Sequence, residues 1–188
     1  VVADIDGREG ARLHVSIELG GMIVLAGDET GLSALLAEVP PAPGREPMRL
    51  VNHGPFHTPL MKGSSEAAMA TLPTGWFAGP GRPMVDGRGH VWRPFASNPE
   101  ALWRYTFEAQ ILETFSFTRA LQVAVREYAP DRVILLGPGD SLGGAIAQAL
   151  IAIEWRGLKS KADFQAMQAS DPYLLSMGRE EQRTLVTT

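Results

Sequence analysis

Residues 48–61 read MRLVNHGPFHTPLM. The apolar run Met48–Val51 predicts a strand, and His57 follows soon after the end of that run. A histidine can take up and return a proton near neutral pH, so His57 is a candidate general base. The alternative is a structural histidine that hydrogen-bonds the backbone in the core or at a cap.

The composition is that of a folded protein of ordinary size. Hydrophobic residues make up 45% of the 188 residues and charged residues 20%, enough for a core in one domain, or one domain with a small appendage. The formal net charge is -4 with no basic cluster, which argues against nucleic acid as a partner. The absence of cysteine excludes disulfides, thiolate metal sites and a thiol nucleophile. For a chain without cysteine we expect the cytoplasm as the default location. No apolar run approaches the roughly 18 residues of a membrane span, so we expect no membrane contact.

The first fifty residues suggest a small sheet with one helix. Alternation over Leu13–Leu19 predicts a half-buried strand, and the apolar run Met22–Gly27 predicts a second one. Asp28 and Thr30 can cap a helix over residues 31–38. With the strand at Met48–Val51, the order is that of a ferredoxin-like unit without its first elements. Residues 1–5 resemble the middle of a strand, so we expect a segment upstream.

The remainder of the chain alternates helices with short strands, which predicts an α/β fold. Residues 132–136 form a continuous apolar run, as buried parallel strands do. The expected helices cover residues 59–72, 100–113, 117–128, 142–155 and 163–169, and the expected short strands cover 83–85 and 90–92 in a loop region from 73 to 99. After the last helix we expect irregular polar sequence.

A serine motif lies between the strand at 132–136 and the helix that follows it. Gly139–Gly143 matches Gly-x-Ser-x-Gly, the pattern of a nucleophile elbow, which makes Ser141 a candidate nucleophile of a serine hydrolase. In α/β-hydrolases, however, the catalytic histidine follows the serine along the chain. All four histidines here, at positions 14, 53, 57 and 90, precede Ser141. The hydrolase therefore stays an alternative.

The segment Asn52–Met61 resembles the histidine signature of the malonyl-CoA:acyl carrier protein transacylase family, in which a strand runs into Gly-Ala-Phe-His-Ser/Thr-Pro-Leu-Met. The resemblance covers roughly residues 12–155. Further matching stretches are the strands Met22–Gly27 and Pro83–Val85, the segment Gln110–Thr118, and the turn Gly137–Gly139 with Leu142 and Gly144. In this register Ser141 has a structural role, and the glycines allow a tight turn.

The resemblance implies an acyltransferase fold. We expect residues 1–52 to form part of a ferredoxin-like small subdomain. Residues 53–188 would form the C-terminal part of an α/β-hydrolase-like large subdomain, with a polar tail from about residue 157. The N-terminal part of the fold would be absent from this chain.

The resemblance also implies acyl transfer from malonyl-CoA, or a related acyl-CoA, to a phosphopantetheinylated acyl carrier protein. His57 would activate a serine, and a backbone carbonyl near Phe115 and Ser116, assigned to Ser116, would orient the histidine. No metal or prosthetic group is required. Phe56 would bind substrate, since in modular relatives a phenylalanine before the histidine accompanies malonyl selection over methylmalonyl. The alternative is that Phe56 is a core aromatic.

Two departures from the family pattern leave the function open. The nucleophile motif Gly-His-Ser-x-Gly and the arginine that pairs with the malonyl carboxylate are absent from these residues, so both are expected in a preceding segment or a companion chain. Glu18–Gly21 also replaces the family's Asn-Ser-Pro-Gly. A non-catalytic acyltransferase-like interaction module is therefore a second alternative. His53 is expected to be structural, and the spacing of His53 and His57 does not suit a metal site.

Overall fold

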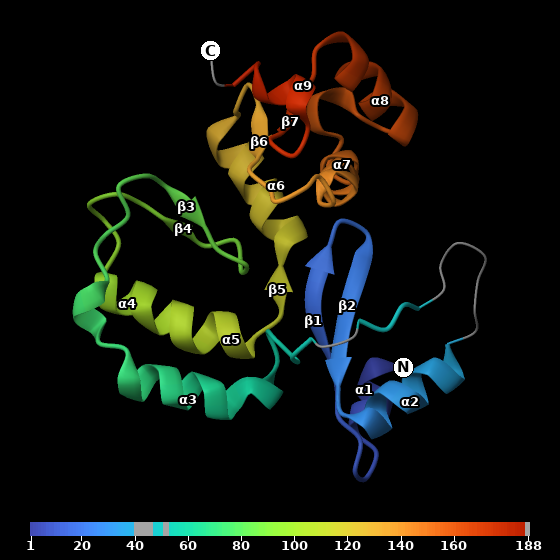
Figure 1. Cartoon of the computed structure of the whole chain (residues 1–188), viewed down its shortest axis with the longest axis vertical. Coiled ribbons are helices and arrows are strands. Elements are labelled where there is room, and N and C mark those ends of the chain that lie inside the picture. Colours follow the sequence, from blue (N-terminus) through green and yellow to red (C-terminus); the bar gives the residue numbers. More distant parts are fainter. Residues whose placement is uncertain (40–46, 51–52, 187–188) are drawn as a thin grey trace. The chain divides into compact units, whose positions relative to one another are not determined.

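The computed structural model describes residues 1–39, 47–50 and 53–186 and has a mixed α/β fold with small sheets (Figure 1). The chain divides into two compact units, which are described separately. The first consists of Val1–Glu18, Ile23–Met84 and Val91–Phe115, and the second of Leu19–Met22, Val85–His90 and Ser116–Thr188. The predicted boundary between residues 52 and 53 falls inside the first unit. Within the described ranges, no helix combines the length and hydrophobicity that crossing a membrane requires.

The first unit begins with a helix, a hairpin and a second helix. These are α1 (Val2–Asp6), β1 (Leu13–Leu19), β2 (Met22–Gly27) and α2 (Glu29–Glu38). The two strands and α2 confirm the sequence predictions, but the strand expected at residues 1–5 was wrong. The amide of Ile5 donates to the carbonyl of Val1 at 2.9 Å, and the fully buried Ile5 packs with Leu13 and Leu35. Burial of one side chain thus overrides the strand preference of valine and isoleucine.

Asp28 caps α2, as its position predicted. Its carboxylate accepts hydrogen bonds from the amides of Gly31 at 2.8 Å and Arg12 at 3.1 Å. These two bonds hold the pKa of Asp28 below its usual value. A Cβ at Gly31 would lie 2.1 Å from the carbonyl oxygen of Arg12, so only glycine allows this close approach.

On its other side, β1 pairs with a two-residue strand that the sequence did not predict. The three-stranded sheet has the order β2-β1-β5, where β5 is Phe115–Ser116. Residues 47–50 have no regular structure, with Met48 and Leu50 exposed, and Val51 lies outside the described residues. Thr114, next to β5, donates a hydrogen bond to the carbonyl of Val15 at 2.7 Å. An apolar run alone therefore did not decide which segment completes the sheet.

Helices make up most of the remaining first unit, and Figure 1 shows α3 running alongside α4 and α5. The expected helix at 59–72 is confirmed, and the one at 100–113 contains a π-helical turn. Ser65 donates to the carbonyl of Phe107 at 2.6 Å, and Trp103 donates to that of Leu72 at 2.9 Å. The elements are the 3₁₀ turns η1 (Pro59–Met61) and η2 (Thr74–Trp76), α3 (Lys62–Thr71), the two-stranded sheet β3 (Met84–Val85) and β4 (Val91–Trp92), α4 (Pro99–Arg104), the π-helical η3 (Tyr105–Ala109) and α5 (Gln110–Leu112).

Over its described residues, the second unit combines four α-helices with a short parallel sheet. Its elements are α6 (Phe117–Tyr128), β6 (Val133–Leu135), α7 (Gly143–Ile151), η4 (Trp155–Gly157), α8 (Lys161–Ser170), β7 (Leu174–Ser176) and α9 (Glu180–Arg183). The register of the parallel pair aligns Val133 with Leu174 and Leu135 with Ser176. The helix expected at 117–128 and the parallel strand expected at 132–136 are both confirmed, whereas α7 ends at Ile151, earlier than expected.

The segment after residue 157 contributes to the core of the second unit, although it was expected to be a polar tail. Leu158, Tyr173 and Leu174 are buried in one cluster with Val125, Ile146 and Leu150. Burial also raises the pKa of the Tyr173 hydroxyl. The run Tyr173–Leu175 is too short to show a period. It becomes a strand because β6 offers a partner edge.

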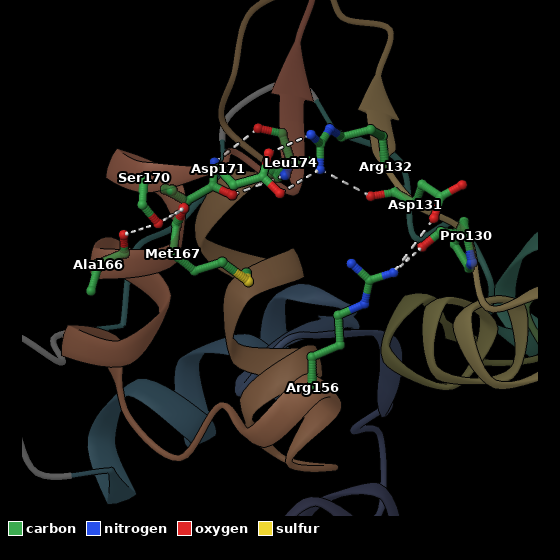
Figure 2. Close-up of polar contacts among 10 residues, drawn as sticks. Pro130, Asp131, Arg132, Arg156, Ala166, Met167, Ser170, Asp171 and Leu174 are labelled. Carbon is green, nitrogen blue, oxygen red and sulfur yellow. Dashed lines mark hydrogen bonds and ion pairs between the residues drawn. The ribbon is translucent and has the colours of Figure 1, made fainter.

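Two arginines form hydrogen bonds and ion pairs around the segment between α6 and β6, as Figure 2 shows. Arg132 donates to the carbonyl of Asp131 at 3.3 Å and forms an ion pair with Asp171, which follows α8. Arg156 donates to the carbonyl of Pro130 at 3.0 Å, and its guanidinium carbon lies 4.7 Å from the centre of the Tyr173 ring. These contacts connect both ends of the α8 region to the start of the parallel sheet.

If the segment after residue 157 is part of the core, Leu174→Ala should lower the free energy of unfolding by about 2–5 kcal/mol, because it leaves a cavity. Leu185→Ala removes a leucine that is 60% exposed in the same segment and should change it by less than about 0.5 kcal/mol. Chemical denaturation of both variants measures this difference. Equal values for the two variants would contradict the buried position of Leu174.

Candidate active site

His57 lies in the turn that leads into η1, and its backbone has φ +58°. This left-handed region is uncommon for a residue with a side chain and costs on the order of 1–3 kcal/mol. Such a conformation persists only where the surrounding structure enforces it. Hydrogen bonds of the neighbouring residues hold the backbone of His57 at this φ angle.

Two buried hydroxyl groups hold the peptide groups around His57. Ser16, in β1, donates a hydrogen bond to the carbonyl of Phe56 at 2.8 Å. Thr58 donates to the carbonyl of Pro55 at 2.6 Å, and its own carbonyl accepts from the amide of Met61 at 3.1 Å. Ser16 is 3% exposed and Thr58 is fully buried, so both hydroxyl groups are shielded from water.

The ring of His57 is fixed by the end of a helix. Its Nδ1 lies 2.5 Å from the carbonyl oxygen of Gln110, the first residue of α5. Because a carbonyl can only accept, Nδ1 carries the proton, and the neutral ring keeps a lone pair on Nε2. Within the described part of the chain, Nε2 has no hydrogen-bond partner. The ring is therefore prepared to accept a proton at Nε2.

The carbonyl of Gln110 is available because of where the helix ends. The last carbonyls of a helix have no partner within it, and Leu112 is the last residue of α5. The carbonyl of Ala109 is used by the amide of Glu113 at 2.8 Å, whereas that of Gln110 meets the imidazole. Gln110 also follows the π-helical turn η3 directly, and such turns are frequent at functional sites.

A pocket of about 240 Å³ opens beside the ring. Its walls are mostly apolar, and the half-exposed ring of Phe56 forms one of them. The ring of Phe115 also stands next to the imidazole, with 5.3 Å between ring centres. The pocket is lined by Phe56, His57, Met61, Ser64, Thr106, Gln110 and Ile111. A pocket of this size suits a short chemical group.

The carbonyl assigned to Ser116 has to be reassigned, because the one at His57 Nδ1 belongs to Gln110. Ser116 is buried, its amide donates to the carbonyl of Gly87 at 2.9 Å, and its hydroxyl caps α6 by accepting from the amide of Arg119 at 3.2 Å. The carbonyl in contact with the ring lies at the start of the resembling segment Gln110–Thr118. The helix end expected near residue 113 could have pointed to a free carbonyl there, because the last carbonyls of a helix lack partners within it.

Ser141 is exposed in the turn before α7, which the amide of Gly143 closes by donating to the carbonyl of Asp140 at 3.0 Å. The preceding glycines take positive φ values, +98° at Gly137 and +73° at Gly139, which supports a turn-forming role. Among the other histidines, His53 is exposed, His14 Nε2 lies 3.7 Å from Asp6, and the amide of His90 donates to Asp86 at 2.9 Å.

Sequence reasoning did not single out Ser16, Met61 or Ile111. Ser16 stands in a strand of alternating pattern, where a buried serine leaves no particular signal. The parts of the chain that the structure describes contain no cluster of three or more His, Asp or Glu residues suited to a metal ion.

Comparisons with protein-family models, curated proteins and solved structures each found no match. The functional argument therefore depends on the residues and their geometry.

We expect neutral His57 to carry its proton on Nδ1, because the Gln110 carbonyl accepts it. Nitrogen-15 NMR of the imidazole distinguishes the two tautomers. Gln110→Ala should leave the tautomer unchanged, since only the backbone of residue 110 takes part. A dominant Nε2–H form in the unsubstituted chain would contradict this geometry.

Proposed function

We propose that this chain is part of an acyltransferase that moves a malonyl or similar short acyl group from CoA to a phosphopantetheinylated acyl carrier protein. The nucleophile is a serine supplied from outside these 188 residues. In this proposal the fold is that of the malonyl-transacylase family, with a ferredoxin-like subdomain and part of an α/β-hydrolase-like subdomain. The observation that carries it is the contact of His57 Nδ1 with the Gln110 carbonyl, which leaves Nε2 as a base beside a small pocket.

In the first half-reaction, the serine hydroxyl attacks the thioester carbon while Nε2 of His57 takes its proton. The carbon–sulfur bond then breaks, and the imidazolium returns the proton to the sulfur, so CoA leaves as a thiol. In the second half-reaction, the carrier's thiol gives its proton to Nε2 and attacks the acyl-serine. The serine oxygen leaves with that proton, and both the serine and His57 are restored.

The Gln110 carbonyl has a defined part in these steps. While Nε2 holds the proton, the ring is an imidazolium, and a hydrogen-bonded carbonyl oxygen stabilises its positive charge. A buried carboxylate does this in Ser-His-Asp triads, where it also fixes the tautomer. A backbone dipole carries less charge than a carboxylate, but it cannot be removed by protonation or by side-chain substitution.

Phe56 connects the site to substrate choice. Its ring lines the pocket next to His57 and is 52% exposed, so it is not a buried core aromatic. A ring in this position leaves little room for a methyl branch next to the thioester carbonyl. This supports the expectation that Phe56 binds substrate and favours malonyl over methylmalonyl.

The base is tested by replacing His57 in the complete polypeptide that carries these residues. His57→Ala should lower kcat for malonyl transfer by roughly 100- to 10,000-fold, the usual contribution of a general base. His53→Ala, an exposed histidine four residues away, should keep full activity. Transfer from radiolabelled malonyl-CoA to carrier protein measures both.

The same assay separates the two alternatives. Full activity in His57→Ala would refute the proposal. Thioester hydrolysis that is lost in Ser141→Ala and is indifferent to the carrier protein would establish the hydrolase. Binding of the carrier protein without any transfer by the complete polypeptide would establish the non-catalytic interaction module.

Replacing Phe56 tests substrate choice separately. Phe56→Ser should raise the ratio of kcat/KM for methylmalonyl-CoA to that for malonyl-CoA by roughly 10- to 200-fold, because a single methyl clash is worth about 1–3 kcal/mol. Phe95→Ser makes the same change at a fully exposed ring in the same unit and should leave the ratio unchanged. An unchanged ratio in both variants would show that Phe56 does not contact the acyl group.

A further inference from the structure

We propose that Ser16 is a positioning residue for His57. It acts through the peptide group between Phe56 and His57, and it determines where Nε2 lies. The catalytic consequence rests on the proposed function, whereas the structural consequence does not. Ser16 lies in β1, 40 residues before Phe56 in the sequence, and its hydroxyl is 2.8 Å from the carbonyl oxygen of Phe56.

The argument begins with the peptide plane. The carbonyl of Phe56 and the amide of His57 belong to one rigid group, so a hydrogen bond to this carbonyl fixes the direction of the amide as well. Rotation from that amide to the Cα is the φ angle of His57, which is held at +58°. The side chain starts from this Cα, so φ sets the direction in which the ring extends towards Gln110. Removing the bond to Ser16 releases a strained angle.

The bonds around His57 have different roles. The bond between Thr58 and Pro55 joins residues three apart, so it shapes the turn from within. The Ser16 bond attaches the turn to the β1 strand, and the Gln110 carbonyl holds the ring from α5. The backbone and the ring of His57 are thus fixed by two separate elements of the first unit. With the strand attachment lost, the ring keeps its hydrogen bond at Nδ1 and its contact with the Phe115 ring, but the backbone that carries it is no longer tied to β1.

Ser16 is also buried, at 3% exposure. Without this hydroxyl, the Phe56 carbonyl would lose its hydrogen-bond partner on the β1 side, and the turn would move to find another one. The shift need not be large, because a displacement of about 1 Å in a catalytic group can reduce the rate on the order of 100-fold.

The test compares Ser16→Ala and Ser16→Thr with Ser176→Ala in the complete polypeptide. Threonine keeps the hydroxyl and suits a strand. Ser176 is a matched control, since it is 4% exposed, its hydroxyl contacts a backbone carbonyl, and it belongs to the second unit. The measurements are the nitrogen-15 signals of the His57 ring, kcat and KM for malonyl transfer, and thermal unfolding.

We expect Ser16→Ala to shift the His57 signals from the pure Nδ1–H tautomer towards the mixture of a solvated imidazole, and to lower kcat roughly 10- to 100-fold at nearly constant KM. Ser16→Thr should restore both, and Ser176→Ala should change only stability. Wild-type ring signals in a folded Ser16→Ala variant would overturn the proposal, as would equal shifts in Ser16→Ala and Ser176→Ala. If the unsubstituted protein transfers no acyl group, the proposed function fails, and the ring signals still decide the role of Ser16.

Discussion

The contact between His57 Nδ1 and the carbonyl of Gln110 is the constraint on which the candidate site depends. A helix must end with carbonyls that lack partners, and this chain ends α5 where one of them meets an imidazole. The same contact satisfies the carbonyl, selects the tautomer and leaves Nε2 as the basic atom. Two needs, one structural and one chemical, are met by a single hydrogen bond.

The rest of the first unit keeps this contact in place. The hydroxyl of Ser65 and the indole of Trp103 tie α3 to the helices that carry Gln110, and Ser16 ties the histidine turn to β1. Each is a side chain that donates to a backbone carbonyl from a distant part of the sequence. The site is thus built from a strand, a turn and a helix end. The pocket beside it is correspondingly small and mostly apolar, in keeping with a short acyl group.

Periodicity and capping residues were reliable guides to much of the fold. The hairpin of β1 and β2, the Asp28 cap, α3 and α6 all follow from local patterns, because alternation, a carboxylate before a helix and a helical period act within a few residues. The wrong predictions of secondary structure share one cause. Residues 1–5, 47–50 and 174–176 carry short apolar runs whose state depends on partners distant in the sequence. Ile5 packs as a helix residue, Met48 and Leu50 remain exposed, and Leu174 joins a strand against β6.

The sequence by itself determined that His57 is the residue to consider, since a histidine in Pro-Phe-His-Thr-Pro follows from local residues alone. The resemblance of residues 110–118 to a segment of the transacylase family led us to expect that a backbone carbonyl there orients this histidine. Only the tertiary structure decided that the carbonyl is that of Gln110, and that Ser16 holds the preceding peptide. The reason is physical. The sequence specifies the type of each side chain. Which of several neighbouring carbonyls that side chain reaches depends on where a helix ends and on how the neighbouring strands and helices pack.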